Sequence, residues 1–157
     1  MRPFAAVLSL FLTACRLSPE ATCQTPCGMD VYGVDGVACE ALARFEARGL
    51  EGLAFLNGDL CRKLSYMHLV VWETDAGKWR DDYGRTVAGL TWCDLQRMEL
   101  GSPNWETTPY FHELAHVAEC PEQDYAHAGW EAKCIWVALQ RLNLEVSIEY
   151  LSNDGGG

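Results

Sequence analysis

The sequence predicts a single domain of the α+β class. Apolar residues recur at helical spacing from Val37 to Gly49, and again from Phe111 to Ala118. Between these segments, Tyr66 to Trp72 is a dense run of aromatic and β-branched residues, which is typical of a strand. The chain has 157 residues, 49% of them hydrophobic and 22% charged, which is the length and composition of one globular domain.

Turn residues and apolar patterning predict the elements between and after these segments. In chain order, they are strands at 86–93 and 96–100, a helix at 129–142 and a strand at 144–151, with a short strand or a loop at 79–83. The final residues, 152–157, are rich in glycine and are expected to be a disordered tail.

The N-terminus has the features of a signal peptide. Arg2 supplies a positive charge, and the apolar run from Phe4 to Leu12 is too short to span a bilayer as a helix. An ordinary signal peptidase would require a small residue at position 12, where this chain has leucine. The segment L-T-A-C that ends at Cys15 instead resembles a bacterial lipobox. The resemblance implies cleavage before Cys15 and attachment of lipid to that cysteine.

The lipobox divides the chain into four parts. These are a signal peptide at 1–14, the lipidated cysteine with a tether at 15–27, a folded domain at 28–151 and the tail at 152–157. The lipid on Cys15 would anchor the protein to a membrane of the bacterial cell envelope. Position 16 holds arginine and not the aspartate of an inner-membrane retention signal, which gives a mild preference for the outer membrane.

The net charge restricts the classes of partner, and the cysteine content bears on the number of disulfides. A net charge of −10 argues against binding to nucleic acid, and nothing in the sequence implies an oligomer. The cysteines after the lipobox form no C-x-x-C pair, so in an exported protein they predict up to three disulfides and one remaining thiol, with the pairing left open. They are Cys23, Cys27, Cys39, Cys61, Cys93, Cys120 and Cys134.

One motif carries chemistry: His-Glu-x-x-His, which begins at His112. On a helix, His112 and His116 lie on one face because they are four residues apart. Two such imidazoles can bind a zinc ion, and Glu113 can take a proton from an attacking water. Thr108, followed by proline, provides a helix start, and Pro121 provides a stop. The apolar stripe beside the histidine face consists of Phe111, Leu114, Ala115 and Ala118.

The order helix, strands, motif helix, loop, helix resembles the zincin metallopeptidase fold. The resemblance implies a small, twisted, mostly antiparallel sheet packed on the active-site helix and on one or two further helices. It also implies an edge strand that binds the substrate as an added strand. Residues 96–100, just before the motif helix, are the candidate for this edge, and an ordinary buried strand fits them equally well.

A catalytic zinc site requires a third protein ligand and one open position. The metzincin pattern is excluded, because Glu119 and Glu122 occupy the positions of its glycine and its third histidine, and no methionine follows Met98. His127 is the first candidate, since a loop after the motif helix can return it to the metal. The segment H-A-G-W from His127 to Trp130 loosely resembles the third-ligand region of SprT-like zincins, with the glycine displaced by one residue.

Other residues compete for this role or assist it. Glu131, near the start of the next helix, is an alternative third ligand. Asp124 and Glu119 are candidates for orienting a ligating imidazole. Tyr125 is a candidate for stabilising the tetrahedral oxyanion. His68 lies within an apolar strand and is not expected to bind the metal.

The resulting hypothesis is a peptidase that acts on a peptide or protein substrate. One zinc ion per chain would be held by His112, His116 and His127, and Glu113 would be the general base. Trp130 is expected to pack against the motif helix and to hold His127 in place. The alternative is a lipid-anchored binding or structural domain in which zinc only stabilises the fold. Such a site needs no Glu113 and usually has four protein ligands.

Overall fold

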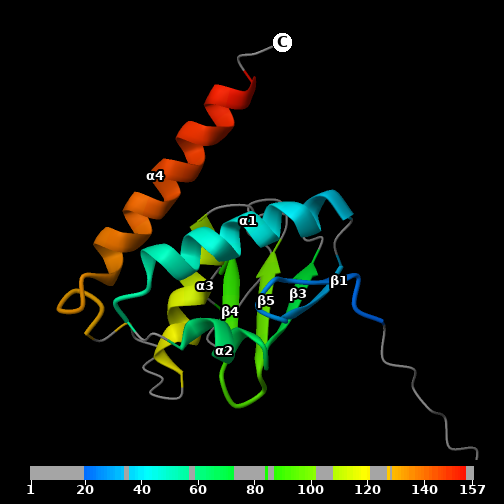
Figure 1. The fold of residues 1–157 in the computed structure, drawn as a ribbon. Helices are drawn as coiled ribbons and strands as arrows, with labels where there is room; N and C mark the ends of the chain where they lie inside the picture. Colours follow the sequence, from blue (N-terminus) through cyan, green and yellow to red (C-terminus); the bar gives the residue numbers. More distant parts are fainter. Residues whose placement is uncertain are drawn as a thin grey trace, which may run out of the picture.

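The computed structural model in Figure 1 shows one sheet with helices packed beside it. The structure describes residues 20–33, 36–56, 59–72, 84, 87–101, 108–120, 127 and 129–154. The signal peptide, the lipobox and the segment 79–83 therefore lie outside the described residues. The helices are α1 (Gly36–Gly52), α2 (Leu60–Leu64), α3 (Thr108–Glu119) and α4 (Ile135–Asp154). The strands are β1 (Cys23–Gln24), β2 (Asp30–Tyr32), β3 (His68–Trp72), β4 (Gly89–Trp92) and β5 (Arg97–Gly101).

The α+β class is confirmed, whereas the expectation of a mostly antiparallel sheet is wrong. The strand order is β1-β2-β3-β5-β4, and the sheet is mixed. The outer pairs, β1 with β2 and β4 with β5, are antiparallel. The central pairs, β2 with β3 and β3 with β5, are parallel. The chain passes through α1 and α2 between β2 and β3, and a helical crossover of this kind joins parallel strands.

Of the two alternatives for residues 96–100, the buried strand is confirmed and the sheet edge is wrong. β5 lies between β3 and β4, so β4 is the terminal strand on this side of the described sheet. The burial of β5 agrees with a central position: Met98, Glu99 and Leu100 are each less than one-tenth exposed. A continuous buried run is typical of a strand that is covered on both faces of the sheet.

The core lies between one face of the sheet and the helices. Val31, Leu69 and Met98 are adjacent in register on this face and are fully buried. Phe45 of α1 and Phe111 of α3 meet above them with ring centroids 6.0 Å apart and belong to the same apolar cluster. α3 also packs against β4, and Figure 1 shows the helix and the strand side by side.

The C-terminal region differs from the expectation. Residues 129–134 form turns, and α4 begins at Ile135 and continues to Asp154, so the expected strand at 144–151 is helical, as is the start of the expected tail. The buried positions explain the outcome. They are Ile135, Leu139, Leu142 and Val146, which recur at helical spacing. Among the described helices, none combines the length and apolar character needed to cross a bilayer.

Three disulfides are present, as the cysteine count predicts. The bridges are Cys23–Cys39, Cys27–Cys61 and Cys93–Cys120. The first two attach the N-terminal strand region to α1 and α2, and the third joins the turn between β4 and β5 to the end of α3. Cys134 is the remaining thiol and is exposed.

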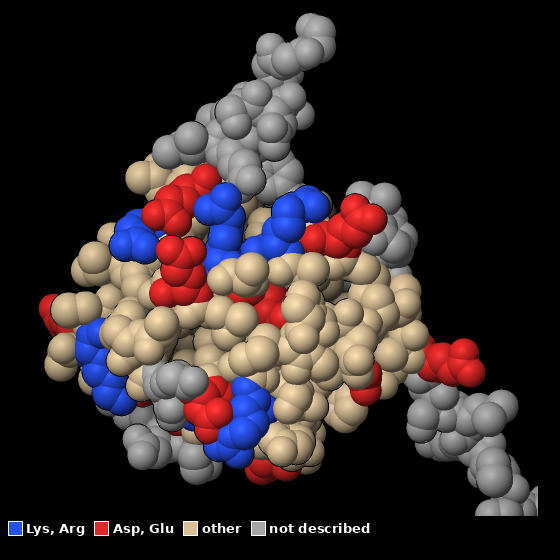
Figure 2. Space-filling view, viewed as in Figure 1, with Lys and Arg blue, Asp and Glu red and all other residues tan. Residues whose placement is uncertain are grey.

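Figure 2 shows how charged side chains are distributed over one face of the protein. On the face shown, lysine and arginine side chains lie beside aspartate and glutamate side chains, and broad areas between them are uncharged. The described residues of this face therefore form no continuous basic patch of the kind that a polyanion would require.

A buried carboxyl group on α1 gives the fold a measurable pH dependence. Glu46 is fully buried, and its Oε1 accepts a hydrogen bond from the Cys27 N–H at 2.8 Å. Oε2 has no hydrogen-bond partner among the described residues. Burial raises the pKa of Glu46 above its ordinary value of 4.5, although hydrogen bonds from Thr25 and Cys27 act in the opposite direction.

We predict that wild-type protein loses stability relative to Glu46→Gln as the pH rises. Because the folded-state pKa is raised, the contribution of Glu46 is fully present below the unfolded-state pKa and declines toward the folded-state pKa. The free energy of unfolding of both proteins should be measured with urea from about pH 4 to pH 8. Glu40→Gln, at an exposed position on the same helix, should parallel the wild type. A difference between wild type and Glu46→Gln that is independent of pH would contradict the prediction.

Candidate metal centre

Three histidines converge next to α3. His112 and His116 lie on one face of this helix because they are four residues apart. The apolar stripe beside them is turned toward the core. His127 comes from the chain between α3 and α4. One nitrogen of each imidazole lies within 4.8 Å of the others, and this group could hold a metal ion. The Nε2 atoms of His112 and His127 are 3.0 Å apart.

A left-handed backbone turn presents His127 to the helix. The φ angle of His127 is +55°, and that of Gly129 is +82°. The N–H of Trp130 donates to the carbonyl oxygen of His127 at 3.1 Å and closes the turn. A left-handed conformation costs a residue other than glycine about 1–2 kcal/mol, so the surrounding contacts must hold it.

Contacts with Trp130 help to hold His127 in this conformation, as the sequence predicts. Its side chain is 2% exposed. Its ring centroid lies 5.0 Å from that of His112, 4.8 Å from that of His116 and 4.5 Å from that of His127. The indole therefore packs against all three imidazoles and covers one side of the cluster.

The environment keeps the imidazoles of His112 and His116 neutral. Burial, reinforced by the nearby His127, lowers the pKa of His112 to about 4. Burial, reinforced by the other two imidazoles, lowers the pKa of His116 to about 3. At neutral pH both rings therefore carry a nitrogen lone pair, which is the form that binds metal.

The donor set fits a transition-metal ion. Zinc–nitrogen bonds of about 2.0–2.1 Å in tetrahedral geometry place two ligand nitrogens about 3.3 Å apart. The His112–His127 separation of 3.0 Å is close to this value. Three imidazoles suit zinc, and they also suit copper, nickel or iron.

Glu113 points toward the sheet and contacts β4. It is 3% exposed, and the Thr91 hydroxyl donates to its Oε2 at 2.8 Å. Gly89 leaves room for the other carboxylate oxygen, because a Cβ at this position would lie 2.6 Å from Glu113 Oε1. Burial raises the pKa of Glu113 to about 8, and the hydrogen bond from Thr91 opposes this rise. Sequence reasoning missed both β4 residues, because nothing local in the sequence links them to α3.

Glu119 and Glu131, which were expected near a bound metal, do not belong to the histidine cluster. The Glu119 carboxylate forms an ion pair with Lys133 at 2.6 Å, which joins the end of α3 to the turn before α4. Glu131 is exposed, and the cluster found among the described residues contains histidines only. His127 is therefore the candidate that the structure brings to the other two imidazoles.

Three further residues singled out in the sequence are Asp124, Tyr125 and His68. Asp124 and Tyr125 fall outside the described residues. His68 is exposed on β3, and its Nδ1 lies 3.6 Å from Oδ2 of Asp30 on the neighbouring strand, away from the cluster.

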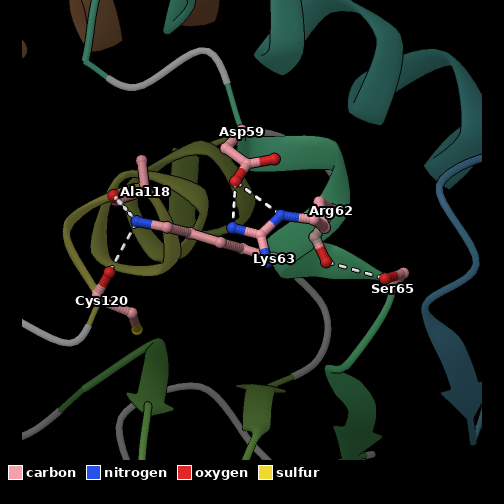
Figure 3. A network of polar contacts seen from close by, with 6 residues as sticks. All are labelled: Asp59, Arg62, Lys63, Ser65, Ala118 and Cys120. Atoms are coloured by element: carbon pink, nitrogen blue, oxygen red, sulfur yellow. Dashed lines mark hydrogen bonds and ion pairs between the residues drawn. The ribbon is translucent and has the colours of Figure 1, made fainter.

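Two contacts anchor the end of α3, and Figure 3 shows the first of them, which Lys63 makes. Lys63 of α2 donates from Nζ to the carbonyl oxygens of Ala118 and Cys120, at 2.5 and 2.6 Å. Ala118 lies in the last helical turn, where carbonyl groups have no partner within the helix, and Cys120 directly follows the helix. The disulfide from Cys120 to Cys93 attaches the same end to the β4–β5 turn. Both anchors fix the helix that carries His112 and His116.

No family model matches the chain, and neither a curated protein nor a solved structure is significantly similar to it. Function must therefore be inferred from the residues and their geometry.

We predict that Thr91→Val destabilises the protein and leaves its metal content unchanged. The variant leaves a buried carboxylate oxygen without its donor, which costs about 1–3 kcal/mol. Thr91→Ser is the matched control because it retains the hydroxyl group. The free energy of unfolding and the metal content of the three proteins should be compared. Equal stability of the valine and serine variants would show that the hydrogen bond to Glu113 is unimportant.

Proposed function

We propose that the protein is a zinc-dependent peptidase. The observation that carries the proposal is the convergence of His112, His116 and His127 beside a buried Glu113. Structural zinc sites usually have four protein ligands. The cluster formed by the described residues offers three histidines, the number of protein ligands in catalytic sites that keep one coordination position for water or substrate.

Glu113 directly follows the first of the clustered histidines, and its pKa suits a general base. A bound zinc ion would polarise the scissile carbonyl group and acidify a water molecule. Glu113 accepts a proton from the attacking water and later delivers it to the leaving amine. Burial raises the pKa of Glu113 to about 8, so both protonation states are accessible near neutral pH. The positive charge of a cation in the site favours the ionised form that the first step needs.

The sheet edge next to Glu113 supports a peptide substrate. β4 is the terminal strand of the described sheet, and its residues Gly89 and Thr91 contact the Glu113 side chain. An extended peptide can pair with an unpartnered strand edge through main-chain hydrogen bonds. A peptide added to β4 would lie along the strand whose residues contact the general base. β4 thus replaces residues 96–100 as the candidate for substrate binding.

The burial of Glu113 also weighs against the alternative of a non-catalytic, lipid-anchored domain. Burying a carboxyl group costs stability unless its interactions compensate for the loss of water. A site that only stabilises the fold gains nothing from this residue, whereas a hydrolytic site requires a base at this position.

We predict that Glu113→Gln retains the metal and loses hydrolysis. Glutamine has the shape of glutamate and no proton-accepting carboxylate, so the rate should fall by about 10²- to 10⁴-fold. Protein from an oxidising compartment should be loaded with zinc. Bound zinc can then be quantified, and cleavage of a mixture of unstructured peptides followed by mass spectrometry.

Glu131→Gln is the matched control, because Glu131 is exposed and lies outside the cluster. It should hydrolyse peptides at the wild-type rate. Unchanged hydrolysis in Glu113→Gln would refute the role of this residue. A zinc-loaded wild type that cleaves no peptide would favour the non-catalytic alternative.

A further inference from the structure

An exposed tryptophan borders the imidazole cluster. Trp136, in the first turn of α4, is 42% exposed. Its ring centroid lies 5.4 Å from that of His127 and 5.9 Å from that of His112. The indole therefore combines contact with two of the metal-site rings and an open surface.

Packing of the fold does not account for Trp136. Trp130 is the indole buried against all three imidazoles, and Trp136 packs beside it with ring centroids 5.0 Å apart. The buried face of α4 is formed by other side chains. They are Ile135, Leu139, Leu142 and Val146. Trp136 thus presents a large apolar surface directly beside the site without contributing to the core.

Helix α3, which carries His112 and His116, lies between the Trp136 indole and β4, the strand proposed to bind substrate. α3 packs against β4 and against α4, and Figure 1 shows α4 beginning on the side of α3 away from β4. If a peptide pairs with β4 as proposed and its carbonyl group reaches the imidazole cluster, the side chain next to this carbonyl can contact Trp136, whose ring borders His112 and His127.

We infer that Trp136 forms the wall of a subsite for the substrate side chain next to the scissile bond. The substrates are then peptides with a large apolar or aromatic residue at this position. An indole face suits such a side chain, because both surfaces lose contact with water and aromatic rings also attract each other edge to face. This inference rests on the proposed peptidase function.

The test uses small zinc-binding probes, so it does not depend on turnover. Acetohydroxamate and 3-phenylpropionyl hydroxamate share the metal-binding group and differ in the side chain. Zinc-loaded wild type should bind the phenyl compound at least about tenfold more tightly, as measured by calorimetry, because an apolar pocket discriminates by about this factor or more. Trp136→Ala should lose this preference and retain one zinc ion per chain.

Leu144→Ala is the matched control. Leu144 is 61% exposed on the same helix, about two turns beyond Trp136, and should be replaceable without changing the preference. Trp136→Phe keeps an aromatic ring and should retain part of the preference, which covers the case in which the alanine variant does not fold.

The outcomes separate this inference from the proposed function. Equal preference in wild type and Trp136→Ala overturns the subsite, and so does a zinc-loaded wild type that binds neither hydroxamate. If zinc-loaded wild type prefers the phenyl compound and cleaves no peptide, the subsite stands and the peptidase proposal fails. If it cleaves peptides, mass spectrometry should show large apolar residues at the cleavage sites, and Trp136→Ala should lose this selectivity.

Discussion

The convergence of three imidazole rings on one point is the constraint on which the rest of the structure depends. His112 and His116 require only a helix, because their spacing places them on one face. His127 must arrive from another part of the chain, through a turn with a left-handed backbone. The buried Trp130 holds all three rings at similar distances. Their crowding and burial keep His112 and His116 neutral and ready to bind a cation.

The fold supports this arrangement by fixing α3. The helix packs on the sheet at β4, while Lys63 and the Cys93–Cys120 disulfide hold its last turn. A small domain has limited apolar surface to bury, and disulfides compensate by restricting the unfolded chain. β4 has two functions in this account. It supplies the space and the hydrogen bond that place Glu113, and in the proposed function its terminal edge binds the peptide.

Local sequence patterns predicted the parts of the structure that depend on local chemistry. Helical spacing identified α1 and α3, and motif spacing identified two of the three clustered histidines. The strand order was not accessible, because β5 inserts between β3 and β4 and nothing in a single strand encodes its neighbours. The region 144–151 matched a strand pattern, but its residues continue a helical face that begins at Ile135. Gly89 and Thr91 were missed for the same reason as the strand order: their contact with Glu113 is created by tertiary packing.

The most direct test compares the zinc content of the wild type with that of His127→Ala and of His68→Ala. Both variants remove one histidine, but only His127 belongs to the cluster, and His68 lies exposed on β3. The account predicts one zinc ion per chain in the wild type and in His68→Ala, and an affinity at least about 100-fold lower in His127→Ala. Zinc held equally well by His127→Ala, or a folded wild type that takes up no zinc, would contradict the three-histidine centre.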